Sequence, residues 1–321
     1  MEKITIHDIE GFNIGHAENR KALTGCTVIL CEEGATGGVD VRGGSPGTRE
    51  TDVLDPQNLV EKIHGVFLSG GSAYGLDVAG GVMKFLEEKG AGFDVTIARV
   101  PIVTGAILFD LYPGDPAVRP DQHLGYEACK NAEKKEELDG SKGAGLGASV
   151  GKCKGFDYAM KGGLGTYAVK IGDLKIGAIV AVNGFGDVID PKTGKPLAGA
   201  YDREKQTYLH TEDILLQQWT ASTNRFQGNT TIGAVITNAV VNKGQANKLA
   251  SIAHDGLART MRPSHTFVDG DTIFTMSTGK VEADLNVVSY LAAFVMEHAV
   301  VNGIQTAEGM GGLPSYQDVH A

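Results

Sequence analysis

The chain has 321 residues, of which 42% are hydrophobic and 21% are charged, and its formal net charge is −10. This composition supports a large buried core and excludes an intrinsically disordered chain. The acidic balance argues against a nucleic-acid partner, because such a partner requires a basic face. Glycine accounts for 45 residues without a collagen-like period, which indicates many tight turns and close backbone approaches.

The cysteines and histidines form no pattern typical of a metal site. Cys26, Cys31, Cys129 and Cys153 include no CxxC pair, and the nine histidines include no HExxH motif. We therefore expect neither a metal nor a cofactor. Cys26 and Cys31 lie in an apolar run and are expected to be core thiols.

The sequence also carries no targeting signal that we can recognise. The first residues contain no apolar signal stretch, and no segment approaches 18 uninterrupted apolar residues. We therefore expect a cytoplasmic protein without a membrane span.

The N-terminal part combines β-rich segments with glycine-rich turns. Over 66–90, a strand, a glycine turn and a helix are expected, since Leu76, Ala79, Met83 and Leu86 recur at helical spacing. The other expected elements are β segments at 4–15 and 24–31, a structured loop at 39–52, a polar surface helix at 126–138, a glycine-rich segment at 143–152, and strands at 164–170 and 176–182.

The C-terminal part begins with an irregular polar stretch, residues 186–228, which predicts a long surface loop with a short helix around Ile214–Trp219. After it the sequence predicts a strand at 230–241, a helix at Lys248–Thr260, a strand at 271–278 and an apolar helix at Asn286–Asn302. Strands and helices do not alternate regularly. This favours a layered α/β sandwich with mixed sheets over a doubly wound parallel fold.

The glycine-rich segment GAGLGASVGK does not fit a nucleotide site. Leu146 stands where a Walker A loop needs glycine, and Cys153 stands where it needs Ser or Thr. No acidic residue follows a strand at the distance that the dinucleotide fingerprint requires. No GxSxG nucleophile elbow occurs either.

Catalytic chemistry is better placed at Asn229-Thr230, where the polar stretch meets a buried strand. Asn-Thr alone is a common strand start. Asp269 and Asp271, at i and i+2, could orient a nucleophile, although they could also be turn residues. A further candidate is Lys152 in GASVGK, beside glycine-rich backbone. Another is Asn183 in AVNGFGD, at the end of an apolar strand, where an oxyanion donor can be held rigidly.

Taken in order, the segments VDVRGGSPGTRETD, LSGGSAYGL, GASVGK, AVNGFGD, NTTIGAVITNA and VDGDTIFTMST run through nearly the whole chain. With them the sequence resembles the self-processing amidohydrolase family that includes D-aminopeptidase, the β-aminopeptidases and the nylon-oligomer (6-aminohexanoate-oligomer) hydrolases. The Asn-Thr junction is more similar to the nylon-oligomer branch than to the aminopeptidase branch, which usually has Gly-Ser there.

The resemblance implies a four-layer αββα sandwich with mixed β-sheets and a single domain, residues 1–321. It implies cleavage between Asn229 and Thr230 into chains 1–229 and 230–321, with Thr230 as the nucleophile. Lys152, Asn183, Asp269 and Asp271 would be its supporting residues. The resemblance also implies a homo-oligomer, with a tetramer favoured. The apolar helix at 286–302 fits an oligomer interface, although burial within one subunit explains it equally well.

The chemistry of threonine agrees with that assignment. Its hydroxyl is a poor nucleophile at neutral pH, whereas a freed α-amine on the same residue has a reference pKa of about 8 and can serve as its base. Asn183 would donate to the oxyanion. Lys152 could lower the pKa of the nucleophile or hold the oxyanion, and Asp269 and Asp271 could bind the new ammonium.

The substrate side departs from the aminopeptidase branch, in which a Glu and a Tyr surround the substrate's amino group. Ile107 and Phe109 occupy the corresponding stretch and cannot pair with an ammonium. We therefore expect an amide hydrolase able to cleave linear, methylene-rich amide oligomers. The alternatives are an aminopeptidase acting on β- or D-aminoacyl amides, an acyltransferase using the same acyl-enzyme, and a binding protein that never matures.

Overall fold

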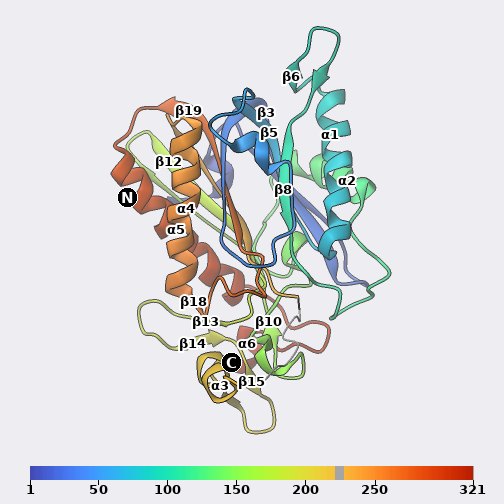
Figure 1. Cartoon of the computed structure of the whole chain (residues 1–321), viewed down its shortest axis with the longest axis vertical. Coiled ribbons are helices and arrows are strands. Elements are labelled where there is room, and N and C mark those ends of the chain that lie inside the picture. The colour runs from blue at the N-terminus through green and yellow to red at the C-terminus, as the bar shows by residue number, and fades with distance from the viewer. Residues whose placement is uncertain (221–227, 321) are drawn as a thin grey trace.

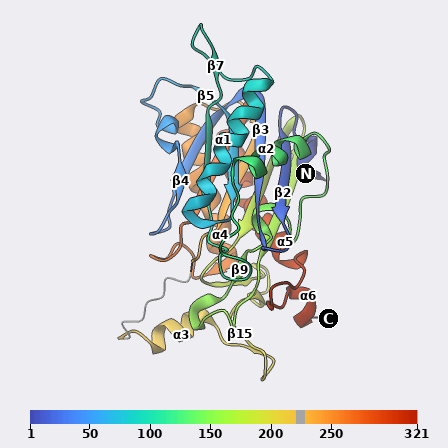
Figure 2. The ribbon, with the colours of Figure 1, turned by 90° about the vertical axis from the view of Figure 1, so that its right-hand side faces the viewer.

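The computed structural model describes residues 1–220 and 228–320, and it arranges them in four layers, with helices on the outside and strands between them (Figures 1 and 2). The helices are α1 (Val78–Glu88), α2 (Gln122–Ala132), α3 (Thr211–Gln217), α4 (Lys243–Thr260), α5 (Leu285–Gln305) and α6 (Tyr316–His320). Helices α4 and α5 pack on one side of the strands, and α1 and α2 pack on the other.

The strands form one 10-stranded mixed sheet that folds over on itself, together with four small sheets. Its path is β1-β11-β12-β17-β19-β3-β5-β8-β4, with β2 paired to β3. The strands are β1 (Glu2–Ile4), β2 (Asn13–Asn19), β3 (Thr24–Val41), β4 (Thr48–Arg49), β5 (Lys62–Ser69), β6 (Phe93–Asp94), β7 (Arg99–Val100), β8 (Val103–Ile107), β9 (Ser149–Val150), β10 (Met160–Lys161), β11 (Gly163–Ile171), β12 (Leu174–Val182), β13 (Asp187–Ile189), β14 (Pro196–Ala198), β15 (Tyr201–Asp202), β16 (Thr207–Tyr208), β17 (Ile232–Ala239), β18 (Met261–Arg262) and β19 (Thr272–Val281).

Strand β3 joins the two halves of the folded sheet. Its first part pairs with β2 and β5, its last part pairs with β19, and the pairing with β5 shifts register between Leu30 and Ala35. One half of the sheet therefore contains β11, β12, β17 and β19, and the other contains β2, β5 and β8. The pairs β17–β19 and β5–β8 are parallel, and the other pairs in this sheet are antiparallel.

Three apolar cores separate the four layers, because the strands alternate their side chains between two faces. On β12, Val180 and Val182 face α4 and α5, whereas Ile179 and Ala181 face the other half of the sheet. On β5, Phe67 packs toward α1 and α2. A strand that is buried on both faces requires apolar residues at consecutive positions, and β12 and β17 have such runs.

Several predicted elements need correction. Residues 4–15 are not one β segment, because Asp8 accepts hydrogen bonds from the backbone and hydroxyl of Thr5 and closes a 3-10 turn there. Helix α2 begins earlier than the predicted 126–138, since Asp121 caps it by accepting from Leu124 N at 2.9 Å. Within 186–228, the described residues form short hairpins and α3, while 221–227 lie outside the described residues.

Other predictions are confirmed. The strand, glycine turn and helix over 66–90 correspond to β5, a 3-10 turn and α1, and the strands at 164–170 and 176–182 correspond to β11 and β12. The prediction of a loop at 39–52 was only partly right, because 39–41 are the last residues of β3 and the loop that follows contains the short strand β4. Cys26 and Cys31 are buried free thiols, as expected.

Helix α5 explains the long apolar stretch near the C-terminus. Among the described residues it alone has the length and hydropathy needed to cross a membrane. Much of that stretch is buried, because α5 packs on α4, β11 and β12. Packing inside the fold therefore explains part of its apolar character, while Leu285, Val287 and Tyr290 are exposed. The expected oligomer stays a prediction.

Candidate active site

The topology brings the five predicted catalytic residues to one end of the sheet. Asn183 follows the last residue of β12, and Thr230 precedes β17. These strands are antiparallel with Ala181 opposite Ile232, so Thr230 N donates to Asn183 O at 2.9 Å. Because β17 and β19 are parallel, with Ile232 beside Thr272, the residues that precede β19 reach the same place; these are Asp269 and Asp271.

The Asn229-Thr230 junction is buried, with 2% and 3% of the two residues exposed. The Thr230 hydroxyl donates to the carbonyl oxygen of Asn229, which places the candidate nucleophile beside the bond that it would cut. Neither polar atom of the Asn229 side chain has a hydrogen-bond partner among the described residues.

Lys152 is fully buried beside this junction. Its ammonium donates to Asn183 O at 3.1 Å, Asn183 Oδ1 at 3.0 Å and Gly228 O at 3.0 Å, so all three of its protons have acceptors. Burial lowers the pKa of Lys152 to about 7, although Asp269, Asp271 and Asp110 act in the opposite direction. A positive charge that is present near neutral pH therefore stands next to the peptide that precedes Thr230.

The Asn183 side-chain amide is fixed from both of its ends. Its Oδ1 accepts from Ser149 N at 2.9 Å as well as from Lys152. Its Nδ2 donates to Phe109 O at 3.1 Å and more weakly to Gly228 O at 3.4 Å. An amide donor is thus held rigidly against the segment that ends at Asn229, as an oxyanion donor must be.

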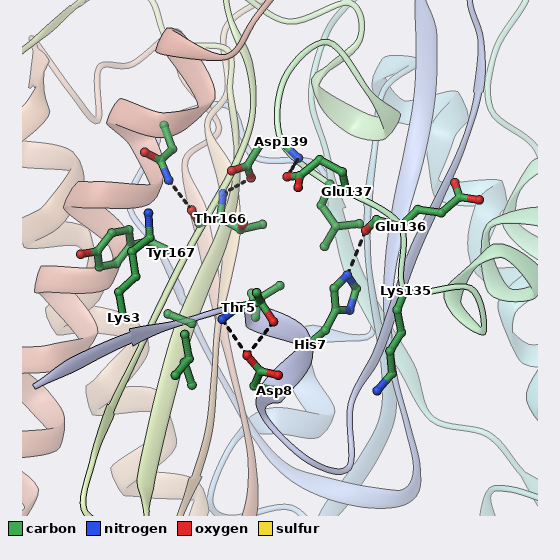
Figure 3. Close-up of a pocket in the computed structure, with 15 residues that line it drawn as sticks. Lys3, Thr5, His7, Asp8, Lys135, Glu136, Glu137, Asp139, Thr166 and Tyr167 are labelled. Atoms are coloured by element: carbon green, nitrogen blue, oxygen red, sulfur yellow. Dashed lines mark hydrogen bonds between the residues drawn. The ribbon is translucent and has the colours of Figure 1, made fainter.

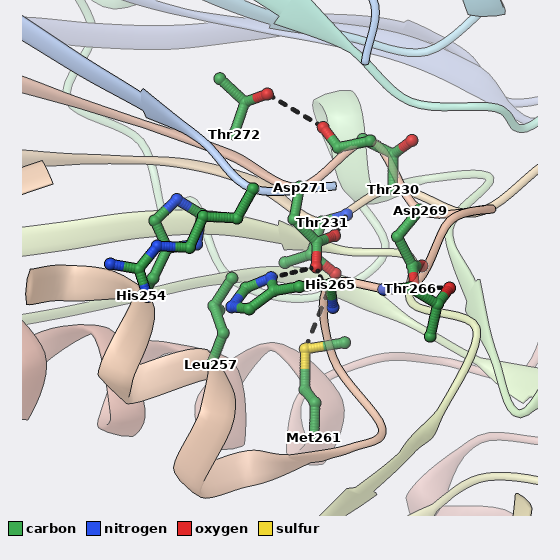
Figure 4. A network of polar contacts seen from close by, with 12 residues as sticks. Thr230, Thr231, His254, Leu257, Met261, His265, Thr266, Asp269, Asp271 and Thr272 are labelled. Carbon is green, nitrogen blue, oxygen red and sulfur yellow. Dashed lines mark hydrogen bonds and ion pairs between the residues drawn. The ribbon is translucent and has the colours of Figure 1, made fainter. Parts of the chain in front are cut away.

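The two aspartates hold different parts of the site (Figure 4). Asp271 accepts from Thr231 N at 2.8 Å and from both the backbone and the ring of His265. Asp269 accepts from Phe185 N at 3.0 Å and from Thr266. Burial, followed by the neighbouring Asp271 carboxylate, raises the pKa of Asp269 to about 7. Asp271 therefore fixes the backbone immediately after Thr230, and Asp269 fixes the backbone after Asn183.

The sequence did not reveal several residues that support the site. His265 and Thr266 hold the aspartates, and Ser149 holds Asn183 through its backbone. His265 lies six residues before Asp271, a spacing that signals no known motif. A backbone contact such as that of Ser149 leaves no signal in residue types at all.

The two predicted substrate-binding residues lie at the end of β8. Ile107 is buried, belongs to the core under α1 and α2, and packs against Gly47. Phe109 has its ring against Gly228, where a Cβ would lie 1.9 Å from the ring, and its carbonyl holds Asn183. Phe109 is thus in contact with the segment before the junction, while a substrate role for either residue stays a prediction.

A separate surface cleft lies between residues 3–8 and residues 135–139, beside β11 (Figure 3). It carries side chains of both charges, and none of the five predicted catalytic residues lines it; its charged residues are Lys3, Asp8, Lys135, Glu136, Glu137 and Asp139. The cleft is therefore separate from the predicted catalytic residues.

Gly270 allows the close approach between the aspartates and Thr230. A Cβ on Gly270 would lie 2.6 Å from Ser45 O and 2.7 Å from Thr230 Oγ1. We expect Gly270→Ala to slow cleavage at Asn229 by about 10- to 100-fold, since a misplacement of about 1 Å can have that effect. Gly244→Ala is the matched control, because Gly244 is exposed and its nearest neighbour would be 3.5 Å away. Intact mass against time measures both rates, and equal rates would contradict this interpretation.

The layered fold defines the structural class: it is the fold of the N-terminal nucleophile hydrolases. The profile of peptidase family S58 matches residues 4–317. The chain belongs to that family, which makes it an enzyme of the peptidase and amidase class.

Relatives of known sequence and structure agree with this assignment. An uncharacterized aminopeptidase of Mycobacterium leprae is 38% identical, over 97% of this chain and 93% of its own. A 6-aminohexanoate-oligomer endohydrolase of Agromyces sp. is 32% identical, over 86% of this chain and 75% of its own. The L-aminopeptidase D-Ala-esterase/amidase of Ochrobactrum anthropi, described as a variant of the Ntn hydrolase fold, superposes with a TM-score of 0.70. Its identity is 20%, and the alignment covers 97% of this chain and 88% of that one, so it shows the fold.

Proposed function

We propose that this protein cleaves itself between Asn229 and Thr230 and then hydrolyses amides with Thr230 as its nucleophile. The observation that carries the proposal is the hydrogen bond from the Thr230 hydroxyl to the Asn229 carbonyl, inside a buried junction. Lys152 supports it from the other side, through its contacts with Gly228 O and Asn183.

Self-cleavage begins when Thr230 Oγ1 attacks the carbonyl carbon of Asn229. The C–N bond breaks, the nitrogen leaves as the α-amine of Thr230, and an ester joins Asn229 to the hydroxyl. Water then hydrolyses the ester, leaving a carboxylate on Asn229 and a free amine and hydroxyl on Thr230. The Lys152 ammonium and the Asn183 amide donate to Gly228 O, one residue before the reacting carbonyl. From there we propose that they stabilise the charge that develops on the Asn229 oxygen during the attack.

The mature enzyme repeats the same chemistry on a substrate amide. The freed amine of Thr230 serves as the base, since its reference pKa is about 8. The resulting acyl-enzyme is hydrolysed by water. The paired aspartates, Asp269 and Asp271, hold the backbone on either side of the nucleophile and attract its ammonium form.

The substrate that we propose is a linear amide whose acyl part is rich in methylene groups, such as a 6-aminohexanoate oligomer. Support comes from the Agromyces relative, named for that activity, and from Ile107 and Phe109, which offer no charge to an ammonium. The second candidate, an aminopeptidase, is favoured by the name of the Mycobacterium leprae relative.

One experiment tests maturation and substrate class together. Purified wild-type protein is followed by intact mass under denaturing conditions, and we expect fragments 1–229 and 230–321. A chain that stays whole on long incubation would contradict the proposal and favour a binding protein.

The matured protein is then given a 6-aminohexanoate oligomer with a free amine and the same oligomer acylated on that amine. We expect hydrolysis of both oligomers. Ile107 and Phe109 carry no acidic group that would bind the substrate's ammonium, so cleavage should not depend on a free amine. Hydrolysis of the free amine alone would point to the aminopeptidase. Product that forms only with an added amine acceptor would point to acyl transfer.

A further inference from the structure

Two buried charged residues outside the catalytic group stand out. Lys161 is 1% exposed and Asp110 is 2% exposed, and neither is part of the chemistry described above. Burying charges is costly unless each is satisfied by hydrogen bonds and by an opposite charge. The hydrogen bonds of Lys161 and Asp110 show which parts of the backbone each residue holds.

Lys161 holds the glycine-rich segment that precedes Ser149. Its ammonium donates to Gly145 O at 3.1 Å, Ala148 O at 2.9 Å and Gly162 O at 3.1 Å, which uses all three protons. On the strand pair β9–β10, Lys161 also stands opposite Ser149. Together with Gly162 N, which donates to Ala148 O at 2.9 Å, the Lys161 side chain thus helps to fix the backbone of Ala148 and Ser149.

Asp110 holds the other wall of the same region. Its carboxylate accepts from Thr24 Oγ1 at 2.7 Å and from Gly71 N at 2.7 Å. It also packs so closely against the glycine-rich segment that a Cβ on Gly147 would lie 2.7 Å from the Cβ of Asp110. Asp110 and Lys161 therefore both contact residues 145–148.

Each of the two charged residues adjoins a backbone group that binds Asn183. Ser149 N, beside the carbonyl that Lys161 holds, donates to Asn183 Oδ1. Phe109 O, one residue before Asp110, accepts from Asn183 Nδ2. On this geometry we propose that Lys161 and Asp110 are positioning residues, which hold the Asn183 amide against Gly228 O, beside the reacting carbonyl of Asn229, through these two backbone groups. The inference rests on the function proposed above.

The electrostatics of the pair agree with this role. Burial lowers the pKa of Lys161 to about 7, and Asp110 opposes that shift. Burial raises the pKa of Asp110 to about 6, and Lys161 is among the groups that oppose it. Each charge thus supports the ionised state of the other, so loss of either weakens the anchoring of the glycine-rich segment.

A double-mutant cycle on self-cleavage tests the proposal. We expect Lys161→Met to slow cleavage by about 10- to 100-fold, and Asn183→Ala to slow it by about 10²–10³-fold. If Lys161 acts through Asn183, the double variant cleaves no more slowly than Asn183→Ala alone, to within about twofold. Multiplied effects of the two changes would overturn the proposal.

Two further variants complete the experiment, one as a control and one as a substitute for Lys161→Met. Lys243→Met removes another buried lysine, whose ammonium donates to Asn58 O at 2.9 Å. Lys243 lies beyond the end of β17 opposite to Thr230, so this variant should leave the rate unchanged. Asp110→Asn keeps the shape of the carboxylate and replaces Lys161→Met if that variant does not fold; it should slow cleavage in the same direction and show the same coupling to Asn183.

Hydrogen exchange separates this inference from the function on which it rests. Exchange of the peptide that contains Ser149 is measured by mass spectrometry in chains kept uncut by Thr230→Ala. We expect faster exchange there by about 10-fold in Lys161→Met and Asp110→Asn, and no change in Lys243→Met, since local opening governs exchange. Unchanged exchange would overturn the positioning role even if wild type never cleaves, whereas cleavage by wild type without the coupling would leave the proposed function intact.

Discussion

Thr230→Ala is expected to abolish the cut and with it all amide hydrolysis. The variant loses the hydroxyl that contacts the Asn229 carbonyl, so no ester can form and no free amine appears on residue 230. The backbone bond from residue 230 to Asn183 O does not involve the side chain, so the fold should be kept. Intact mass should show one chain of full length after an incubation that converts wild type completely.

Thr230→Ser is the matched control. It retains the hydroxyl but lacks the methyl group that restricts rotation about χ1. We expect fragments of the same composition, formed within about 10-fold of the wild-type rate, because a freely rotating hydroxyl spends less time in the attacking position. Cleavage of Thr230→Ala at the same junction would refute the nucleophile assignment, since another group would then be attacking.

The layered architecture could be predicted because apolar runs and strand order constrain it locally. The runs at 176–182 and 230–241 have the consecutive apolar residues that a strand buried on both faces requires, and they became β12 and β17. The stretch 4–15 was misjudged because the short contact between Thr5 and Asp8 outweighed the β propensity around it. Local polar contacts of this kind compete with strand formation.

The candidate site was predicted only in part, for a different reason. Thr230, Lys152, Asn183 and the two aspartates carry reactive groups in segments that resemble a known family, and the structure brings them together. Residues that act through backbone contacts give no such signal. Lys161 reaches Ala148 through the register of a two-stranded sheet, and Asp110 meets Thr24 across 86 residues, so both depend on the completed fold.

Lys152→Met is expected to slow self-cleavage by about 10²–10³-fold, the usual effect of removing one group that stabilises an oxyanion. Methionine keeps most of the length of the side chain in its fully buried position but cannot donate to Gly228 O or Asn183. First-order rates come from intact mass, and Lys243→Met, a similar change at a distant buried lysine, should leave the rate at the wild-type value.

The pH dependence identifies which form of Lys152 acts. Its three bonds to carbonyl oxygens require the ammonium, and its pKa is about 7. As pH rises through 7 the charge is lost in wild type, whereas Lys152→Met has no charge to lose. The ratio of the wild-type rate to the Lys152→Met rate should therefore fall as pH increases from about 6 to about 8, and any titration common to both proteins cancels. A ratio that rises over the same interval would show instead that the neutral amine acts as a base toward the Thr230 hydroxyl.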